Sequence, residues 1–261
     1  LSNLCDNRYV AALSSGTSAI HLALILLGIK KGDEVLCSSF TFAASANPIV
    51  YQGAVPIFID SELETWNMCP KQLEIAIIDR IKVKSKPKAI ILVHLYGMPS
   101  DLNKIISIGK KYNIPIIEDA AEGLGSTYNG KPLGSFTEIG IYSFNGNKII
   151  TTSSGGSIMS SDKKIIDKAR FLATQARDNM AHYEHSEIGY NYRLSNVSAA
   201  IGIGQLEVLE KRVNKRREIF QYYKDQLADI SEITFTIESE GSFSNRWLST
   251  ILISEDSKID R

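Results

Sequence analysis

Short apolar runs alternate with helix-like stretches along the first 160 residues of the chain. Runs of a few residues rich in Val, Ile and Leu predict buried strands. We expect seven such strands, which begin at Tyr9, Glu34, Val55, Ala89, Ile114, Ile139 and Gly156. Between the earlier runs, the spacing of apolar positions predicts helices over 17–27, 43–51, 70–81 and 102–112, the last one capped by Asp101.

This alternation is typical of a mostly parallel sheet that is covered by helices on both faces. The pattern therefore predicts an α/β fold with a central sheet between helices. In open sheets of this kind, ligands bind beyond the carboxyl ends of the strands. The residues that directly follow each predicted strand are accordingly the first candidates for a functional site.

The pattern changes after this region. Over 194–229 apolar positions recur at helical spacing, which predicts one long helix whose charged second half is a solvated face. Two strand-like runs follow, at Ile233 and Trp247, and the chain stops without the partners that they need. We predict a large domain over 1–229, with its N-terminal run-in missing, and the truncated beginning of a smaller α/β domain over 230–261.

Composition and charge exclude several classes of protein. The 29 basic and 29 acidic side chains balance, so nothing global favours nucleic acid or an anionic membrane surface. The longest apolar run, 19–29, is too short to span a bilayer, and the first residues lack the pattern of a secretory signal. The three widely spaced cysteines fit a reduced, cytoplasmic protein better than a disulfide framework.

The turn after the first predicted strand is a candidate phosphate site. It reads SSGTS, and a helix is expected to open at about Thr17. Free amides at a helix N-terminus, with the hydroxyls of Ser15, Thr17 and Ser18 nearby, form a cradle suited to an anion. A simple N-cap in a tight turn would explain the same residues, so both interpretations stay open.

Two further strand ends carry candidate residues. Asp119 follows the fifth strand, where its carboxylate can pair with a protonated ring nitrogen of a ligand or cap the next turn. Phe40 and Phe42 follow the second strand and belong either to the core or to the face of a planar ligand.

Lys148 stands in the segment GIYSFNGNKIITTSSGG, five residues after Ser143, which ends the sixth strand. It is either a solvated turn lysine or an amine that attacks a carbonyl. Each of these features alone is a weak signal. Together, an anion cradle, a carboxylate, an aromatic face and an amine at successive strand ends form the set that pyridoxal phosphate requires.

The residues quoted above also carry a resemblance. The sequence is similar to the DegT/DnrJ/EryC1/StrS family of sugar aminotransferases, within the aspartate-aminotransferase-like fold type I of pyridoxal phosphate-dependent transferases. The similarity covers nearly the whole chain, in order and spacing, through SSGTSAIHLAL, GDEVLCSSFTFAASANPI, VHLYGMPSDLNKI, IIEDAAEGLGSTYNGKPLGSF, YSFNGNKIITT and GYNYRLSNVSAAIGIGQLE. It implies pyridoxal 5'-phosphate as cofactor and a homodimer with shared active sites.

The resemblance also implies roles for single residues. Lys148 matches the lysine that forms a Schiff base with the cofactor, and Asp119 matches the acid that faces the pyridinium nitrogen. Phe42 matches the aromatic residue stacked on the ring, and Glu122 a residue near the phenolic oxygen. The phosphate-binding positions of the family are matched by Gly16, Thr17 and Ser143. Asn191 matches the asparagine that reaches the phosphate of the neighbouring subunit. The resemblance also places Tyr192 and Arg193 near the sugar nucleotide.

The activity implied is transfer of an amino group from an amino acid, expected to be glutamate, to a keto group of a nucleotide-linked keto-deoxy sugar in glycan or polysaccharide biosynthesis. The segments SFNGNKIITT and SNRW, which begins at Ser244, resemble members that act on UDP-linked 4-keto-6-deoxy sugars. Three alternatives stay open. The first is a sugar dehydratase of the family, in which a histidine replaces the lysine. The second is a lyase or desulfurase, which would need its own nucleophile, and the third is a non-catalytic regulatory relative. The presence of Lys148 and Asp119 argues against the first and the last of these.

Two features of the sequence are not part of this resemblance. The segment SSGG at 153–156 is less glycine-rich than the TTGGGG or TTGEGG of relatives, which predicts a stiffer loop. His182 and His185 have a spacing that permits a metal site, but no further motif supports one, so we expect no metal. We expect His185 to lie in a loop or to face the substrate.

Overall fold

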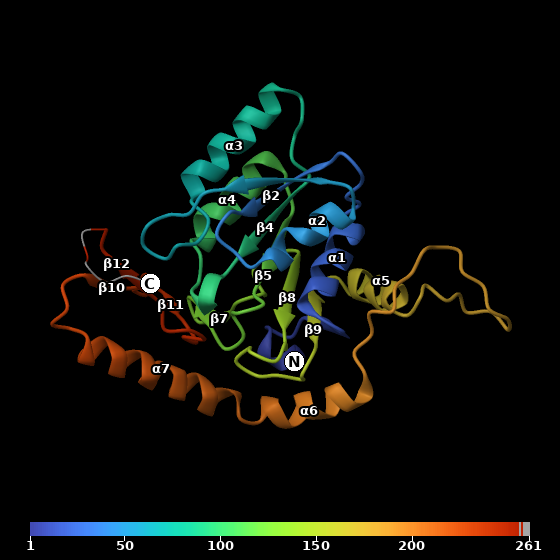
Figure 1. Ribbon diagram of the computed structural model, residues 1–261. Coiled ribbons are helices and arrows are strands. Elements are labelled where there is room, and N and C mark those ends of the chain that lie inside the picture. The colour runs from blue at the N-terminus through green and yellow to red at the C-terminus, as the bar shows by residue number, and fades with distance from the viewer. Residues whose placement is uncertain (256, 258–261) are drawn as a thin grey trace.

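The computed structural model describes residues 1–255 and 257. Seven strands form a central sheet in the order β1-β9-β8-β5-β4-β2-β3 (Figure 1). Neighbouring strands run parallel, except that β9 is antiparallel to both β8 and β1. All seven predicted strands are present: β1 (Tyr9–Leu13), β2 (Glu34–Ser38), β3 (Val55–Ile59), β4 (Ala89–Val93), β5 (Ile116–Asp119), β8 (Ile139–Ser143) and β9 (Gly156–Ser160).

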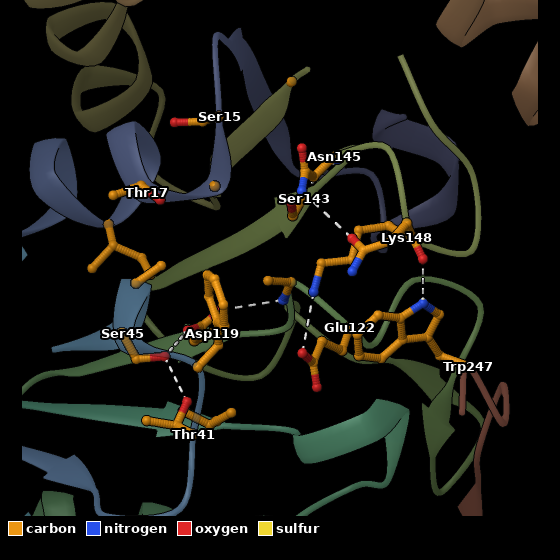
Figure 2. Close-up of a pocket in the computed structure, with 18 residues that line it drawn as sticks. Ser15, Thr17, Thr41, Ser45, Asp119, Glu122, Ser143, Asn145, Lys148 and Trp247 are labelled. Atoms are coloured by element: carbon orange, nitrogen blue, oxygen red, sulfur yellow. Dashed lines mark hydrogen bonds and ion pairs between the residues drawn. The ribbon is translucent and has the colours of Figure 1, made fainter. Parts of the chain in front are cut away.

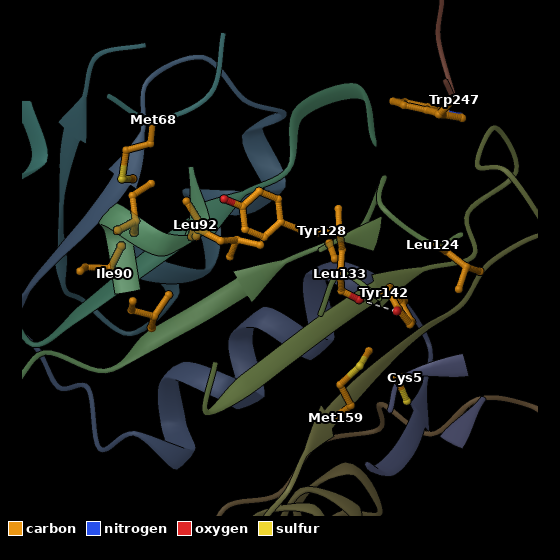
Figure 3. Close-up of a cluster of buried hydrophobic side chains, with 14 of the residues drawn as sticks. Cys5, Met68, Ile90, Leu92, Leu124, Tyr128, Leu133, Tyr142, Met159 and Trp247 are labelled. Carbon is orange, nitrogen blue, oxygen red and sulfur yellow. Dashed lines mark hydrogen bonds between the residues drawn. The ribbon is translucent and has the colours of Figure 1, made fainter. Parts of the chain in front are cut away.

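Helices cover both faces of this sheet, as the alternating pattern predicted. Side chains of successive strand residues point to opposite faces, so Ile90 and Leu92 pack into one core cluster and Ile91 into the other. The first cluster (Figure 3) is covered by α3 (Pro70–Lys82) and α4 (Leu102–Tyr112). The second is covered by α1 (Gly16–Leu26) and α5 (Lys163–Ala173). The predicted α/β sheet between helices is therefore confirmed.

One predicted helix, over 43–51, is split in two. The structure has a 3-10 turn, η2 (Ala43–Ser45), followed by a short helix, α2 (Asn47–Tyr51). Pro48 stands in the first turn of α2. Because proline has no backbone N–H, it cannot donate the bond that a continuous helix needs at this position. The other short 3-10 turns are η1 (Ser2–Leu4) and η3 (Leu95–Gly97).

The predicted long helix over 194–229 is also wrong in detail. It is divided into α6 (Asn196–Leu206) and α7 (Leu209–Gln226), which follow one another along one edge of the molecule (Figure 1). Val208, between them, has φ −108° and ψ 7°. Its N–H binds the carbonyl of Gln205, three residues back, so the helical hydrogen-bond ladder is interrupted there.

The two strand-like runs after α7 have partners, contrary to the expectation from the sequence. They pair with each other as β10 (Ile233–Phe235) and β12 (Ile251–Ile253), in antiparallel register. Between them, β11 (Ser242–Phe243) adds to a small sheet with β6 (Thr127–Tyr128) and β7 (Lys131–Pro132). The predicted smaller domain over 230–261 thus contains a strand that pairs with the earlier part of the chain, while its residues 256 and 258–261 lie outside the described residues.

The boundaries of α1, α3 and α4 agree with the predicted ranges to within one residue. Asp101 caps α4 as predicted, because its side chain accepts a hydrogen bond from the N–H of Lys104. Among the helices of the described residues, none has the length and apolar content needed to cross a membrane.

Candidate functional site

A cavity of about 240 Å³ lies at the carboxyl ends of the parallel strands (Figure 2). Segments that follow β1, β2, β5 and β8 line it, as predicted for an open α/β sheet. Eight candidate residues from the sequence line this one cavity together: Ser15, Gly16, Thr17, Phe42, Asp119, Glu122, Ser143 and Lys148.

Lys148 is paired with an acid inside the cavity. Its Nζ lies 3.1 Å from Oε1 of Glu122, and the two side chains are only 11% and 10% exposed. The second carboxylate oxygen of Glu122 accepts a hydrogen bond of 2.6 Å from the N–H of Tyr96. Lys148 is thus a partly buried amine held at a fixed place, and the interpretation as a solvated turn lysine is wrong.

The electrostatics of Glu122 follow from this burial. Removal of the carboxylate from water raises its pKa above the ordinary value, while the Lys148 charge and the Tyr96 N–H act in the opposite direction. Burial is the larger influence, so the pKa of Glu122 remains raised. The carboxyl group is therefore able to hold a proton at a higher pH than an exposed glutamate.

Trp247 encloses Lys148 from another side. The Lys148 Nζ lies 4.1 Å from the centroid of the indole ring, which is a cation–π contact. The indole Nε1–H donates a 2.7 Å hydrogen bond to the carbonyl of Asn147, next to the lysine. Sequence reasoning placed Trp247 at the start of a strand and missed its position in the site. The one signal for this position in the sequence is the motif SNRW, whose resemblance to relatives points to the substrate rather than to Lys148.

Asp119 ends β5 and is 4% exposed. Its Oδ2 accepts a 2.7 Å hydrogen bond from the Ser45 hydroxyl, and Oδ1 accepts one of 3.2 Å from the N–H of Ala121. The Thr41 hydroxyl lies 2.8 Å from that of Ser45. Because the one hydrogen of Ser45 is directed to Asp119, Thr41 donates to Ser45. Asp119 thus caps the next turn, which confirms that interpretation, and also presents a fixed carboxylate to the cavity, where its pairing with a ring nitrogen stays a prediction.

The N-terminus of α1 forms the opposite wall. Ser15 is the N-cap, and its side chain accepts a hydrogen bond from the N–H of Ser18 in a capping box. The backbone N–H groups of Gly16 and Thr17 belong to the first turn, which has no preceding carbonyl within the helix. A Cβ on Gly16 would lie 3.1 Å from that of Ser143, so glycine permits the close approach of this helix to β8. The N-cap is confirmed, and the phosphate interpretation, which the free amides of this turn allow, stays a prediction.

The two phenylalanines after β2 are not core residues. Phe42 is 73% exposed and Phe40 is 46% exposed, so the interpretation that places them in the core is wrong. Phe42 lines the cavity and offers an aromatic face to a planar ligand.

In the part of the chain that the structure describes, four predicted site residues do not line this cavity: Asn191, Tyr192, Arg193 and His185. Tyr192 directs its hydroxyl to Nδ1 of His21, at 3.0 Å. His185 lies in an exposed loop, with Nδ1 at 2.9 Å from the carbonyl of Gln175. Asn191 was expected to reach a second subunit, so its place in this protomer leaves that role a prediction. Within residues 1–255 and 257, no group of three or more His, Cys, Asp or Glu side chains could hold a metal ion.

The donor set fits pyridoxal phosphate. The helix N-terminus suits its phosphate, the Asp119 carboxylate its ring nitrogen and the Lys148 amine its aldehyde. All three line one cavity, and the exposed ring of Phe42 supplies an aromatic surface beside them.

Comparisons with known proteins agree with this geometry. EpsN of Bacillus subtilis, whose name describes a pyridoxal phosphate-dependent aminotransferase, is 56% identical over 94% of this chain. GDP-perosamine synthase of Escherichia coli O157:H7 is 42% identical over 94% of it. The crystal structure of a DegT DnrJ EryC1 StrS aminotransferase from Brucella abortus superposes with a TM-score of 0.89 at 32% identity, over 95% of this chain. The structural match confirms the predicted aspartate-aminotransferase-like fold.

This chain spans only part of those relatives: 63% of EpsN, 65% of the perosamine synthase and 66% of the Brucella chain. The sequence profile of the DegT/DnrJ/EryC1/StrS aminotransferase family matches residues 1–261. The predicted resemblance is thereby confirmed, and pyridoxal phosphate is the cofactor of the family. The chain belongs to the DegT/DnrJ/EryC1/StrS aminotransferase family.

Proposed function

We propose that the protein is a pyridoxal phosphate-dependent aminotransferase that moves an amino group from an amino acid to a keto group of a nucleotide-linked keto-deoxy sugar. The observation that carries this proposal is that the Lys148 amine and the Asp119 carboxylate line one cavity at the ends of the parallel strands. The name of the perosamine synthase relative supports a sugar linked to a nucleotide as substrate. Glutamate is the donor that we propose.

The cofactor, when bound, supplies an electron sink for the carbon next to the transferred nitrogen. Lys148 would hold it covalently, and its free Nζ would act as general base and acid. In that role Nζ would take a proton from the donor's α-carbon and, in the second half of the reaction, give one to the sugar carbon that receives the nitrogen. The contacts with Glu122 and Trp247 hold Nζ near the place where this work is done.

Asp119 keeps a proton on the ring nitrogen through a charge-assisted hydrogen bond. The hydroxyl of Ser45 and the N–H of Ala121 orient its carboxylate before any ligand arrives. The cavity-lining residues Gly16, Thr17 and Ser143 would bind the phosphate, and Phe42 would supply the aromatic face for the ring. Glu122, whose pKa is raised by burial, lines the same cavity and would lie near the phenolic oxygen of the bound cofactor.

The proposal includes a homodimer with shared active sites. Helix α6 is rich in apolar residues, yet none of its residues is buried in the described protomer. Val197 and Ile203 are 74% and 66% exposed, which supports a second subunit against this helix. Asn191 would then reach the partner's phosphate, with Tyr192, Arg193 and His185 near the sugar nucleotide.

We also propose that residues 1–229 are the large domain and that a smaller domain begins at 230. The three cysteines are free, which supports a reducing, cytoplasmic location.

Borohydride reduction of the cofactor-loaded protein, followed by peptide mapping, tests the proposal. We expect the reduced cofactor on Lys148, and attachment to another lysine, or no uptake of cofactor, would overturn it. A Lys148→Ala variant should keep the fold and lose transfer of nitrogen from 15N-glutamate to a GDP- or UDP-linked 4-keto sugar. Labelled product from this variant would remove Lys148 from the reaction.

A further inference from the structure

A short segment after α7 meets both members of the Lys148–Glu122 pair. Residues 245–247 follow β11, and they reach the cavity from a part of the chain that is 100 positions away from Asn147. Figure 2 shows the indole of Trp247 beside the Lys148 side chain, with its dashed bond to the loop.

Asn245 fixes this segment to the loop that carries Glu122. It is fully buried, and its Nδ2 donates hydrogen bonds of 2.8 Å and 2.9 Å to the carbonyls of Glu122 and Leu124. Its Oδ1 accepts a bond of 2.8 Å from the backbone N–H of Trp247, which fixes the main chain at this residue. The fit is close, since a Cβ on Gly97 would lie 2.0 Å from that Oδ1.

Trp247 fixes the other side. Its Nε1–H donates to the carbonyl of Asn147, one residue before the lysine, and the face of its ring lies against the Lys148 Nζ. Trp247 is only 6% exposed, so water does not compete with either contact. The two contacts restrict Nζ in different ways: one holds the backbone at the root of the side chain, and the other bounds its tip.

We propose that Trp247 is a positioning residue that confines the Lys148 amine opposite Glu122 and shields it from solvent. This inference rests on the proposed function, in which Lys148 carries the cofactor. Loss of the indole should make Lys148 more accessible to a small free reagent. The same loss should make its attachment to a bound cofactor less complete, because Nζ is no longer held at one place. These opposite effects distinguish positioning from a merely structural role.

The variants are Trp247→Leu, which removes both contacts, and Trp247→Phe, which keeps an aromatic face and removes the N–H donor. Phe243→Leu is the matched control. Phe243 lies in β11, two residues before that segment, and makes a similar cation–π contact, with Arg217 at 4.2 Å, but it does not line the cavity.

The first measurement uses the cofactor-free proteins. Acylation of Lys148 by an amine-specific reagent is followed by peptide mapping and normalised to the exposed Lys30. We expect Lys148 labelling to rise at least about threefold in Trp247→Leu, less in Trp247→Phe and not in Phe243→Leu. Equal labelling in Trp247→Leu and the unmodified protein would overturn the inference, whatever the protein does with pyridoxal phosphate.

The second measurement uses the proteins loaded with pyridoxal phosphate. The fraction of bound cofactor that borohydride fixes to Lys148 should fall about threefold in Trp247→Leu, with partial rescue in Trp247→Phe. A loss of total binding and of melting temperature with an unchanged fraction would show a structural role only and overturn the inference. If the unmodified protein takes up no cofactor, the proposed function fails, and the acylation result alone decides the role of Trp247.

Discussion

Lys148 and Glu122 form an ion pair of 3.1 Å in which the acid nevertheless has a raised pKa, because burial outweighs the attraction of the lysine. The sign of the pH effect follows. A carboxyl group whose pKa is higher in the folded than in the unfolded protein binds more protons when folded over that interval. Its contribution to stability is therefore present below the unfolded pKa and is lost as pH rises through the folded value.

We predict that a Glu122→Gln variant lacks this loss. In the cofactor-free protein, the free energy of unfolding of the unmodified chain should fall relative to that of the variant as pH rises from about 4.5 to neutrality. Urea denaturation of both proteins at several pH values measures the difference. A difference that stays constant, or that grows in favour of Glu122, would contradict the assignment of the raised pKa to this residue.

The Ser45 hydroxyl provides the second prediction. It donates a 2.7 Å hydrogen bond to the buried Asp119 carboxylate. Hydrogen bonds to charged groups contribute roughly 1.5–3 kcal/mol to stability, so Ser45→Ala should lower the free energy of unfolding by about that much. Because the carboxylate is then no longer held in one orientation, the variant should also bind pyridoxal phosphate more weakly. Thr41→Val is the control, because the Thr41 hydroxyl reaches Ser45 rather than the acid, and its effect should be smaller. Spectroscopic titration with the cofactor measures both, and equal affinities for Ser45→Ala and the unmodified protein would exclude this role.

The strands of the sheet could be predicted from the sequence because burial on both faces leaves little choice of residue. Ile90 and Ile91 belong to opposite core clusters, and both positions require an apolar side chain. Helix α4 could be predicted with its bounds because Asp101 caps its start and Asn113, with φ 49°, ends it in the left-handed conformation. These signals act within a few residues, so the sequence alone displays them.

Two features of the fold show different limits. The interruption at Pro48 was open to prediction, because a proline inside a helical pattern removes a donor. The interruption at Val208 could not be predicted, because valine and its two neighbours do not break helices and all have a backbone N–H. Such a break is set by tertiary packing rather than by local propensity.

The candidate site divides in the same way. Asp119, Ser143 and Lys148 follow or end strands, and the topology of a parallel sheet brings such positions to one edge. Trp247 reaches the cavity from a segment that Asn245 anchors to the loop after β5. That contact joins positions more than 120 residues apart, and no periodicity in the sequence encodes it.

The three cysteines should differ in reactivity. Cys37 is fully buried, and burial together with the nearby Asp119 charge raises the pKa of its thiol to about 12. Burial also raises the pKa of Cys5, whereas Cys69 is partly exposed. At pH 8, iodoacetamide should label Cys69 of the native protein and leave Cys37 unmodified until the chain is unfolded. Mass spectrometry of digests checks this, with Cys69→Ser as the control that should lack rapid labelling, and rapid labelling of Cys37 would contradict its burial.

The loop before β9 offers a prediction about stability. Ser153 has φ 70°, a left-handed conformation that costs residues other than glycine roughly 1–2 kcal/mol. Its side chain is exposed, and its N–H bond of 2.9 Å to Thr151 Oγ1 does not depend on that side chain. Part of this gain in stability is lost, because glycine increases the conformational entropy of the unfolded chain. Ser153→Gly should therefore stabilise the protein by about 0.5–1 kcal/mol.

The neighbouring Ser154 is the matched control for this substitution. It is also exposed, but its φ is not positive, and its hydroxyl donates a 2.7 Å hydrogen bond to the carbonyl of Ser14. Ser154→Gly should destabilise the protein by about 1 kcal/mol, because it loses this bond and gains only unfolded-state freedom. Thermal and urea denaturation of the two variants should consequently shift in opposite directions. A shift of the same sign in both would mean that the left-handed backbone at Ser153 carries no cost that glycine relieves.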